Sequence, residues 1–167
     1  MLTPELKNEI DSETKRLLKE FVPHLESEFE KAKDKSNLLL CLTEQHPAPE
    51  YFPQEQAVKS HVSELIGVLR ANAQIFGMIL PYSYENLAII TRDVDREEFA
   101  AKLHAARDIV ASYSFGRTLQ QDFITITFGV SSYPFDANDP HELFKQAGLA
   151  LQAAKKAGGN TVRCYWN

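Results

Sequence analysis

The sequence predicts an α+β domain in which helices flank an antiparallel sheet of the ferredoxin-like kind, preceded by an N-terminal helical extension. Three observations lead to this class. The 167 residues are 44% hydrophobic and 25% charged, which fits one globular domain with an appended element. A continuous apolar run at residues 38–42 is typical of a strand covered on both faces. From that run onward the predicted order is β-α-β-β-α-β-α-β, which contains the split βαβ plan with one helix and one strand added.

A highly charged helical segment opens the chain, with Thr3 as its N-cap and Pro4 at the first helical position. Apolar residues recur along it at helical spacing: Leu6, Ile10, Leu17, Phe21 and Leu25. Pro23 interrupts this stripe. Because a proline removes one helical hydrogen bond and clashes with the preceding turn, we expect two helices in series rather than one rod. The stripe fits a helix that packs on its own domain as well as a signalling or dimerisation helix.

The N-terminal helical extension or signalling helix is assigned to residues 1–20 and the folded domain to residues 21–167. Within the domain, the strand at 38–42 should be central in the sheet. A loop with three prolines follows it, and then a helix over about residues 54–70. Two strands at 75–80 and 87–91 are expected to form a hairpin whose connecting residues are unusually aromatic.

Two helices of the second half have clear start signals. Asp95 is followed three residues later by Glu98, which is the reciprocal capping arrangement, and the helix it opens should run to about residue 113. Asp139 is followed by Pro140 at the first helical position and Glu142 at the third. Both helices are therefore predicted with defined first turns.

Two strands complete the prediction. Residues 123–130 alternate apolar residues with threonine, which predicts a strand with one buried face. The last helix ends in lysines that suit the negative end of the helix dipole, and Gly158 is placed for a left-handed cap. Residues 161–165 should then add an edge strand.

The charge and cysteine content exclude several classes of function. A net charge of −5 and no concentrated basic face argue against nucleic acid as a partner. Cys41 lies in an apolar run and reads as a buried thiol, and its spacing from Cys164 matches no metal-ligand pattern. The longest apolar run is too short to span a bilayer. We therefore expect a cytoplasmic domain with reduced cysteines.

The end of the chain pairs a strand with a helix in a specific way. The strand carries Thr125, Thr127, Gly129 and Val130. The helix and the turn after it carry Ala147, Ala150, Leu151, Ala154, Lys155, Gly158 and Asn160. This pairing resembles the C-terminal half of the GGDEF domain, the diguanylate cyclase family of bacterial signalling proteins, whose enzymes join two GTP into cyclic di-GMP. The resemblance covers about residues 21–165 and implies the sheet of the nucleotide-cyclase palm.

The signature loop of that family should fall at the predicted hairpin. The best register places five residues over Gly-Gly-Asp-Glu-Phe, and none of the five is identical: Ser83, Tyr84, Glu85, Asn86 and Leu87. In the family the two glycines let the backbone approach the triphosphate, so the side chains of Ser83 and Tyr84 would obstruct that approach. The resemblance thus implies an altered nucleotide site.

The resemblance also implies two divalent cations, Mg²⁺ or Mn²⁺, held by carboxylates in an active enzyme. Thr43 falls nearest the aspartate that ends the family's first strand, and a hydroxyl is a weak ligand for such ions. Glu85 keeps an acidic group in the loop. Glu44 would serve only after a slip of one residue, which turns its side chain to the opposite face. Lys155 is retained where the family's lysine meets the terminal phosphate, although a lysine there also complements a helix dipole.

The string Arg92-Asp93-Val94-Asp95 matches the Arg-x-x-Asp of the family's inhibitory cyclic di-GMP site but follows the signature loop instead of preceding it. Residues 74–77 occupy the upstream place. We therefore expect Arg92 to be solvated at a strand end, Asp95 to cap a helix, and the inhibitory site to be missing.

These substitutions favour a catalytically inactive, degenerate GGDEF domain that acts as a signalling, regulatory or protein-interaction module and needs no cofactor. Its expected partners are a neighbouring sensor or output domain, another signalling protein, or a second copy bound through the N-terminal helices. One alternative is a divergent diguanylate cyclase with Glu85, Thr43 and Glu44 as metal ligands. Another is a nucleotide-sensing receptor in which Tyr82 and Tyr84 stack on a flat ligand.

Overall fold

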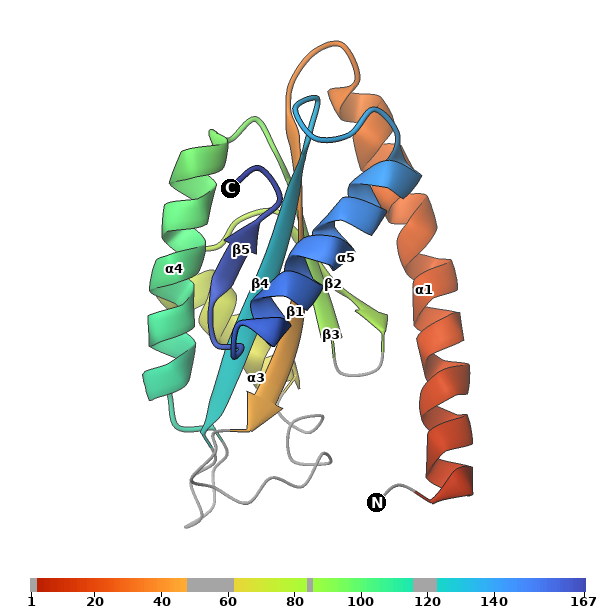
Figure 1. Ribbon diagram of the computed structural model, residues 1–167, viewed down its shortest axis with the longest axis vertical. Coiled ribbons are helices and arrows are strands. Elements are labelled where there is room, and N and C mark those ends of the chain that lie inside the picture. Colours follow the sequence, from red (N-terminus) through yellow and green to blue (C-terminus); the bar gives the residue numbers. More distant parts are fainter. Residues whose placement is uncertain (1–2, 48–61, 84–85, 116–122) are drawn as a thin grey trace.

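The computed structural model describes residues 3–47, 62–83, 86–115 and 123–167. Five strands among these residues form one sheet in the order β2-β3-β1-β4-β5 (Figure 1). Their bounds are β1 Leu38–Pro47, β2 Met78–Ser83, β3 Asn86–Arg92, β4 Ile124–Tyr133 and β5 Val162–Cys164. The predicted fold class and the central place of β1 are confirmed. The sheet is mixed, because β5 joins β4 in parallel while the other neighbours are antiparallel.

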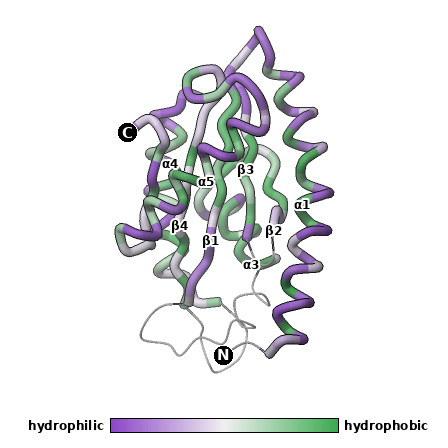
Figure 2. Tube along the Cα trace, turned by 45° about the vertical axis from the view of Figure 1, so that its right-hand side comes forward, coloured by the Kyte–Doolittle hydropathy of each residue, from purple (hydrophilic) through white to green (hydrophobic). Residues whose placement is uncertain are grey.

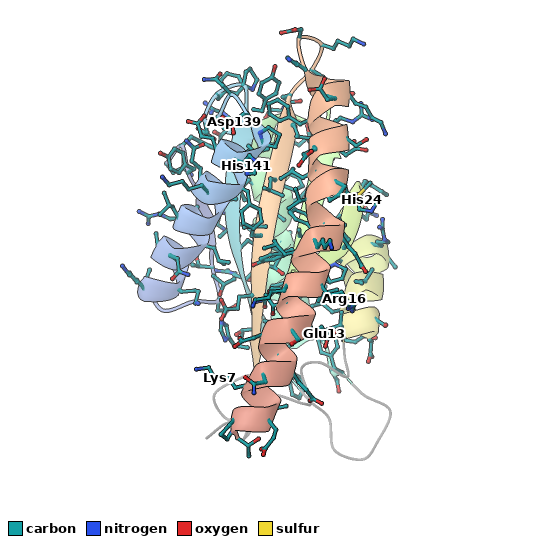
Figure 3. All side chains as sticks on the ribbon, turned by 90° about the vertical axis from the view of Figure 1, so that its right-hand side faces the viewer. Lys7, Glu13, Arg16, His24, Asp139 and His141 are labelled. Atoms are coloured by element: carbon teal, nitrogen blue, oxygen red, sulfur yellow. The ribbon has the colours of Figure 1, made fainter. Side chains whose placement is uncertain are left out.

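Helix α1 spans Pro4–Ala32 as one helix of 29 residues, so the expected pair of helices is wrong. Phe21 and Leu25, on either side of Pro23, are buried in the same core, and this packing offsets the hydrogen bond that the proline removes. Thr3 caps the helix by accepting a hydrogen bond from the Leu6 amide. Figure 3 looks onto α1, whose surface carries Lys7, Glu13, Arg16 and His24. The helix passes residue 20 without a break, and the division into extension and domain stays a prediction.

Helix α1 and helix α5, Pro140–Lys156, cover one face of the sheet. The other face is covered by α3, Val62–Gly67, and by α4, Arg96–Ser112. Helix α3 continues as a short π-helix at Val68–Asn72. The predicted cap of α4 is confirmed, since Asp95 accepts from the Glu98 amide at 2.9 Å. The first part of the helix expected over 54–70, and the proline-rich loop beyond residue 47, lie outside the described residues.

The hairpin of β2 and β3 is tighter than expected. Pro81, Tyr82 and Ser83 belong to β2, and Ser83 pairs with Asn86, so only residues 84 and 85 lie between the strands. Strand β2 begins at Met78 instead of Ile75. Four residues predicted in the turn therefore lie in strands: Pro81, Tyr82 and Ser83 in β2 and Asn86 in β3.

Strand β4 and helix α5, Pro140–Lys156, make direct backbone contact. A Cβ at Gly129 would lie 2.3 Å from the Leu151 nitrogen, so only glycine allows α5 to approach this closely. Both faces of β4 are buried along nearly its whole length, which corrects the expected single buried face, because α5 covers the second face. The cap of α5 is confirmed by the bond from the Glu142 amide to Asp139.

The turn after α5 carries the predicted left-handed cap. Gly158, Gly159 and Asn160 have φ angles of +117°, +72° and +50°. Glycine adopts such angles without a steric penalty. The turn leads directly into β5, which lies at the edge of the sheet as predicted.

Alternate residues of β1 face two separate hydrophobic cores. Leu39 and Cys41 belong to the core under α3 and α4, whereas Leu38, Leu40 and Leu42 belong to the core under α1 and α5. Figure 2 shows hydrophobic strands in the interior and hydrophilic residues recurring along α1. The two-sided burial explains why this strand is a continuous apolar run.

Candidate functional site

Thr43 lies at the point where the ladder between β1 and β3 ends. The last paired residues of that ladder are Leu42 and Ala88. Beyond them the Thr43 hydroxyl takes over: it accepts from the Leu87 amide at 3.2 Å and lies 3.0 Å from the Leu87 carbonyl oxygen. Thr43 is fully buried. Its hydroxyl therefore joins two strands and is committed to backbone groups.

Two further polar side chains complete this junction. The Gln45 side chain is buried, and its Oε1 lies 3.2 Å from the Thr43 hydroxyl. Tyr82 donates its hydroxyl proton to the Thr43 carbonyl at 3.2 Å. Burial, the largest influence, raises the pKa of Tyr82 above its ordinary range, so the phenol stays a hydrogen-bond donor. Sequence reasoning missed both partners, although Gln45 is two residues from Thr43 and shares its face.

Glu44 faces the other side of β1 and meets the end of α5. Its Oε2 lies 2.8 Å from Nζ of Lys155, and its Oε1 lies 3.6 Å from Nε2 of His46. The Glu44 side chain is 24% exposed and that of Lys155 is 33% exposed. Lys155 is thus neutralised within the chain. The expectation that Thr43 and Glu44 point to opposite faces is confirmed.

The residues aligned with the signature loop are only partly described. Ser83 accepts a hydrogen bond from the Asn86 side-chain amide at 3.0 Å, which closes the base of the hairpin. Leu87 is fully buried in the core under α3 and α4. Tyr84 and Glu85 lie outside the described residues. The described members of this segment serve the hairpin and the core.

Tyr82 does not form an exposed stacking surface, which corrects that part of the receptor hypothesis. Its ring is 9% exposed and lies with Phe21 and Phe144 in the core under α1 and α5. The alternation of β2 turns this side chain toward α1. Tyr84 lies outside the described residues.

Arg92 is half-buried and bonded, not solvated as expected. Its Nε donates to Glu28 of α1 at 2.8 Å, because β3 ends under the second half of that helix. Asp95 caps α4 as predicted. Arg92 and Asp95, the residues that match the arginine and aspartate of the string, therefore both have structural partners.

The described donor groups do not fit a pair of divalent cations. Thr43 is buried and bonded to Leu87, and Glu44 lies on the opposite face beside a lysine. Over residues 3–47, 62–83, 86–115 and 123–167, no three His, Cys, Asp or Glu side chains gather in a way that could hold a metal ion. Cys41 and Cys164 are buried and free, and burial raises the pKa of both thiols, that of Cys164 to about 11. Both are therefore protonated thiols at neutral pH, and a thiol is a weaker nucleophile than a thiolate.

The sheet order, the hairpin between β2 and β3, and the contact of α5 with Gly129 define a nucleotide-cyclase palm domain. The chain belongs to the GGDEF family: the model of the diguanylate cyclase GGDEF domain matches residues 59–161, more than half of its length. None of the curated protein sequences matches this chain. In the helices that the structure describes, no segment has the length and apolar character needed to cross a membrane.

Solved structures support the same fold. The GGDEF domain of DgcB from Caulobacter crescentus, in complex with c-di-GMP, is 20% identical with a TM-score of 0.72, covering 90% of this chain and 91% of that one. A structure of the DgcB coiled coil and GGDEF domain has 20% identity, a TM-score of 0.69 and coverages of 95% and 88%. The active GGEEF domain of a Vibrio cholerae diguanylate cyclase has 18% identity, a TM-score of 0.68 and coverages of 88% and 95%.

Proposed function

We propose that this chain is a catalytically inactive, degenerate GGDEF domain that acts as a signalling, regulatory or protein-interaction module. The observation that carries the proposal is the state of Thr43. A cyclase of this family needs a carboxylate near this place to hold divalent cations, which neutralise phosphate charge during attack. Here the position holds a buried, uncharged hydroxyl that bonds both backbone groups of Leu87.

The pairing of Lys155 supports the same proposal. The resemblance implies that this lysine meets the terminal phosphate of GTP in active members. In this chain its ammonium is 2.8 Å from the Glu44 carboxylate. A phosphate would have to displace that carboxylate and would then lie next to its charge, which disfavours binding.

Two alternative functions make different predictions. A divergent cyclase would use Glu85, Thr43 and Glu44 with Mg²⁺ or Mn²⁺, and this requires Glu44 to leave Lys155. A nucleotide-sensing receptor would bind GTP or cyclic di-GMP without turnover. The inactive module needs neither ion nor nucleotide.

Helix α1 is the element that would connect the module to its partner. Its exposed surface is charged, and in a relative, DgcB, a coiled coil accompanies the GGDEF domain. We propose that α1 of this chain receives or transmits a signal from a neighbouring sensor or output domain, another signalling protein or a second copy, in the cytoplasm.

The test is a nucleotide panel on the purified protein. With GTP and Mg²⁺ or Mn²⁺, chromatography should detect no cyclic di-GMP, whereas an active GGDEF cyclase run in parallel should produce it. GTP and cyclic di-GMP should leave the melting temperature at the value of the blank. Product formation would contradict the proposal. A rise with GTP that Glu85→Ala abolishes would favour the divergent cyclase, and a rise without turnover would favour the receptor.

A further inference from the structure

Two grooves meet at one end of the sheet, away from the junction at Thr43. The larger one, about 720 Å³, lies between the turn after α1, the turn before α4 and the turn after β4. These three connections gather at the top of the molecule in Figure 1. The second groove, about 550 Å³, runs between α1 and the ends of β2 and β3. Asp93 lines both grooves, so the two grooves adjoin at this residue, and together they are called the trough here.

The shape of the trough suits an extended segment. Either groove alone is as large as a small-molecule site. Glu28 and Gly77 line one groove, Asn37 and Phe135 line the other, and Asp93 belongs to both. An extended chain segment can contact both linings, whereas a compact ligand would occupy one groove.

Some of the charged side chains along the trough have ion-pair partners within the chain, and others have none in the part of the chain that the structure describes. Arg92 is bonded to Glu28 at 2.8 Å. The Arg96 guanidinium lies over two rings, 4.3 Å from the centroid of Phe135 and 5.0 Å from that of Trp166. The carboxylates of Asp34 and Asp93 have no ion-pair partner among the described residues, and Lys35 is the remaining basic residue of the lining. The lining therefore favours a cation from outside.

An aromatic surface adjoins these carboxylates. Phe135 is 65% exposed although it packs against Arg96, and Trp166 is held in place by a hydrogen bond from its Nε1 to Glu97 at 3.0 Å. Aromatic residues and arginine are enriched at protein interfaces, where rigid side chains lose little entropy on binding. The Arg96 stack thus supplies a fixed apolar surface beside the uncommitted carboxylates.

We propose that the trough binds a segment of a partner protein in which a lysine or arginine neighbours an aromatic side chain. The basic group pairs with Asp93 and Asp34, and the aromatic ring lies against Phe135. This inference rests on the proposed function of an interaction module and gives that module a surface.

The experiment uses an alternating arginine–tryptophan hexapeptide as probe and a glutamate–tryptophan hexapeptide as its charge-reversed control. Amide shifts of the full chain are followed by NMR at about 150 mM salt, which screens distant charges. Shifts should concentrate at the lining of the two grooves, residues 34–37, 77–78, 90–96 and 133–135. The double variant Asp34→Asn/Asp93→Asn should weaken binding by about fivefold, because it removes both exposed charge pairs.

Asparagine is a suitable replacement because Asp34 and Asp93 both have a φ of +61°, which asparagine tolerates. Asp11→Asn removes an exposed charge from α1, outside the trough, and should leave affinity unchanged. Phe135→Ser should also weaken binding, whereas Phe76→Ser, at an equal exposure of 65% but not lining either groove, should not.

Scattered shifts, equal binding of both peptides, or equal effects of Asp11→Asn and the double variant would overturn the inference, as would no binding. None of these outcomes bears on cyclase activity, which the nucleotide panel measures. Failure of the docking surface and failure of the proposed inactive domain are therefore distinguishable.

Discussion

Glu44 and Lys155 form an ion pair of 2.8 Å that joins the last part of β1 to the last turn of α5. In the resemblance to active cyclases, the lysine would serve a phosphate. Here the Glu44 carboxylate occupies the place next to Lys155 that a phosphate would take. The positive charge of Lys155 is thereby paired inside the protein.

Glu44→Gln should lower the free energy of unfolding modestly, by about 0.5–1 kcal/mol, because both partners are partly exposed and screened by water. Urea denaturation at neutral pH measures the change. Glu26→Gln, an exposed residue of α1, is the matched control and should have no effect. A loss of several kcal/mol in Glu44→Gln would mean that the pair is effectively buried.

Thr43→Val keeps the shape of the side chain and removes its hydroxyl. The Leu87 amide and the Gln45 side chain then lose a buried partner, so the free energy of unfolding should fall by about 1–3 kcal/mol. Thr125→Val, which removes a long 3.4 Å bond to the His46 carbonyl at a part-buried position, should cost much less. Equal costs in the two variants would argue against a structural role for Thr43.

Gly129→Ala should destabilise the domain by about 3 kcal/mol or more, since the new methyl group would meet the backbone of α5 at 2.3 Å from the Leu151 nitrogen. Gly148→Ala is the matched control, because a Cβ there meets nothing within 4 Å. Inside a helix it should stabilise by about 0.5–1 kcal/mol. Thermal unfolding of both variants should show changes of opposite sign.

The ionisation of Glu28 should make the free energy of unfolding depend on pH in the acidic range. Burial alone would raise its pKa, but hydrogen bonds from Lys31 and Arg92 and the charges of both outweigh burial and lower it. A lowered pKa contributes stability that is complete above the unfolded value of 4.5 and is lost as pH falls through the folded value. Glu28→Gln should therefore be less stable than the native chain at pH about 7, by about 1 kcal/mol, and the gap should close toward pH about 3. A gap that persists in acid would contradict this assignment.

The sequence predicted well those features that depend on neighbours in the chain. The caps at Asp95 and Asp139, the strand at 38–42 and the glycine turn after α5 all follow from local patterns, and all are present. Features that depend on distant segments were missed. Pro23 lies within one helix because Phe21 and Leu25 pack on a sheet that the local pattern does not describe.

The site was predicted in the same uneven way. The sequence identified Thr43 as an uncharged replacement and placed Glu44 on the opposite face. It did not indicate that Tyr82 would turn inward or that Arg92 would meet Glu28, because each contact joins residues at least 39 positions apart. Long-range partners of this kind come from the packing of whole elements.

The burial of Tyr82 has a mechanical consequence. Its ring packs 6.1 Å from the ring of Phe21 on α1, and its hydroxyl bonds the Thr43 carbonyl on β1. Any shift or rotation of α1 that moves Phe21 must therefore also displace Tyr82 or open a void beside it. The N-terminal helix is thus coupled to the centre of the sheet through Tyr82, so a displacement of α1 reaches β1 through two contacts: Phe21 with Tyr82, and Tyr82 with Thr43.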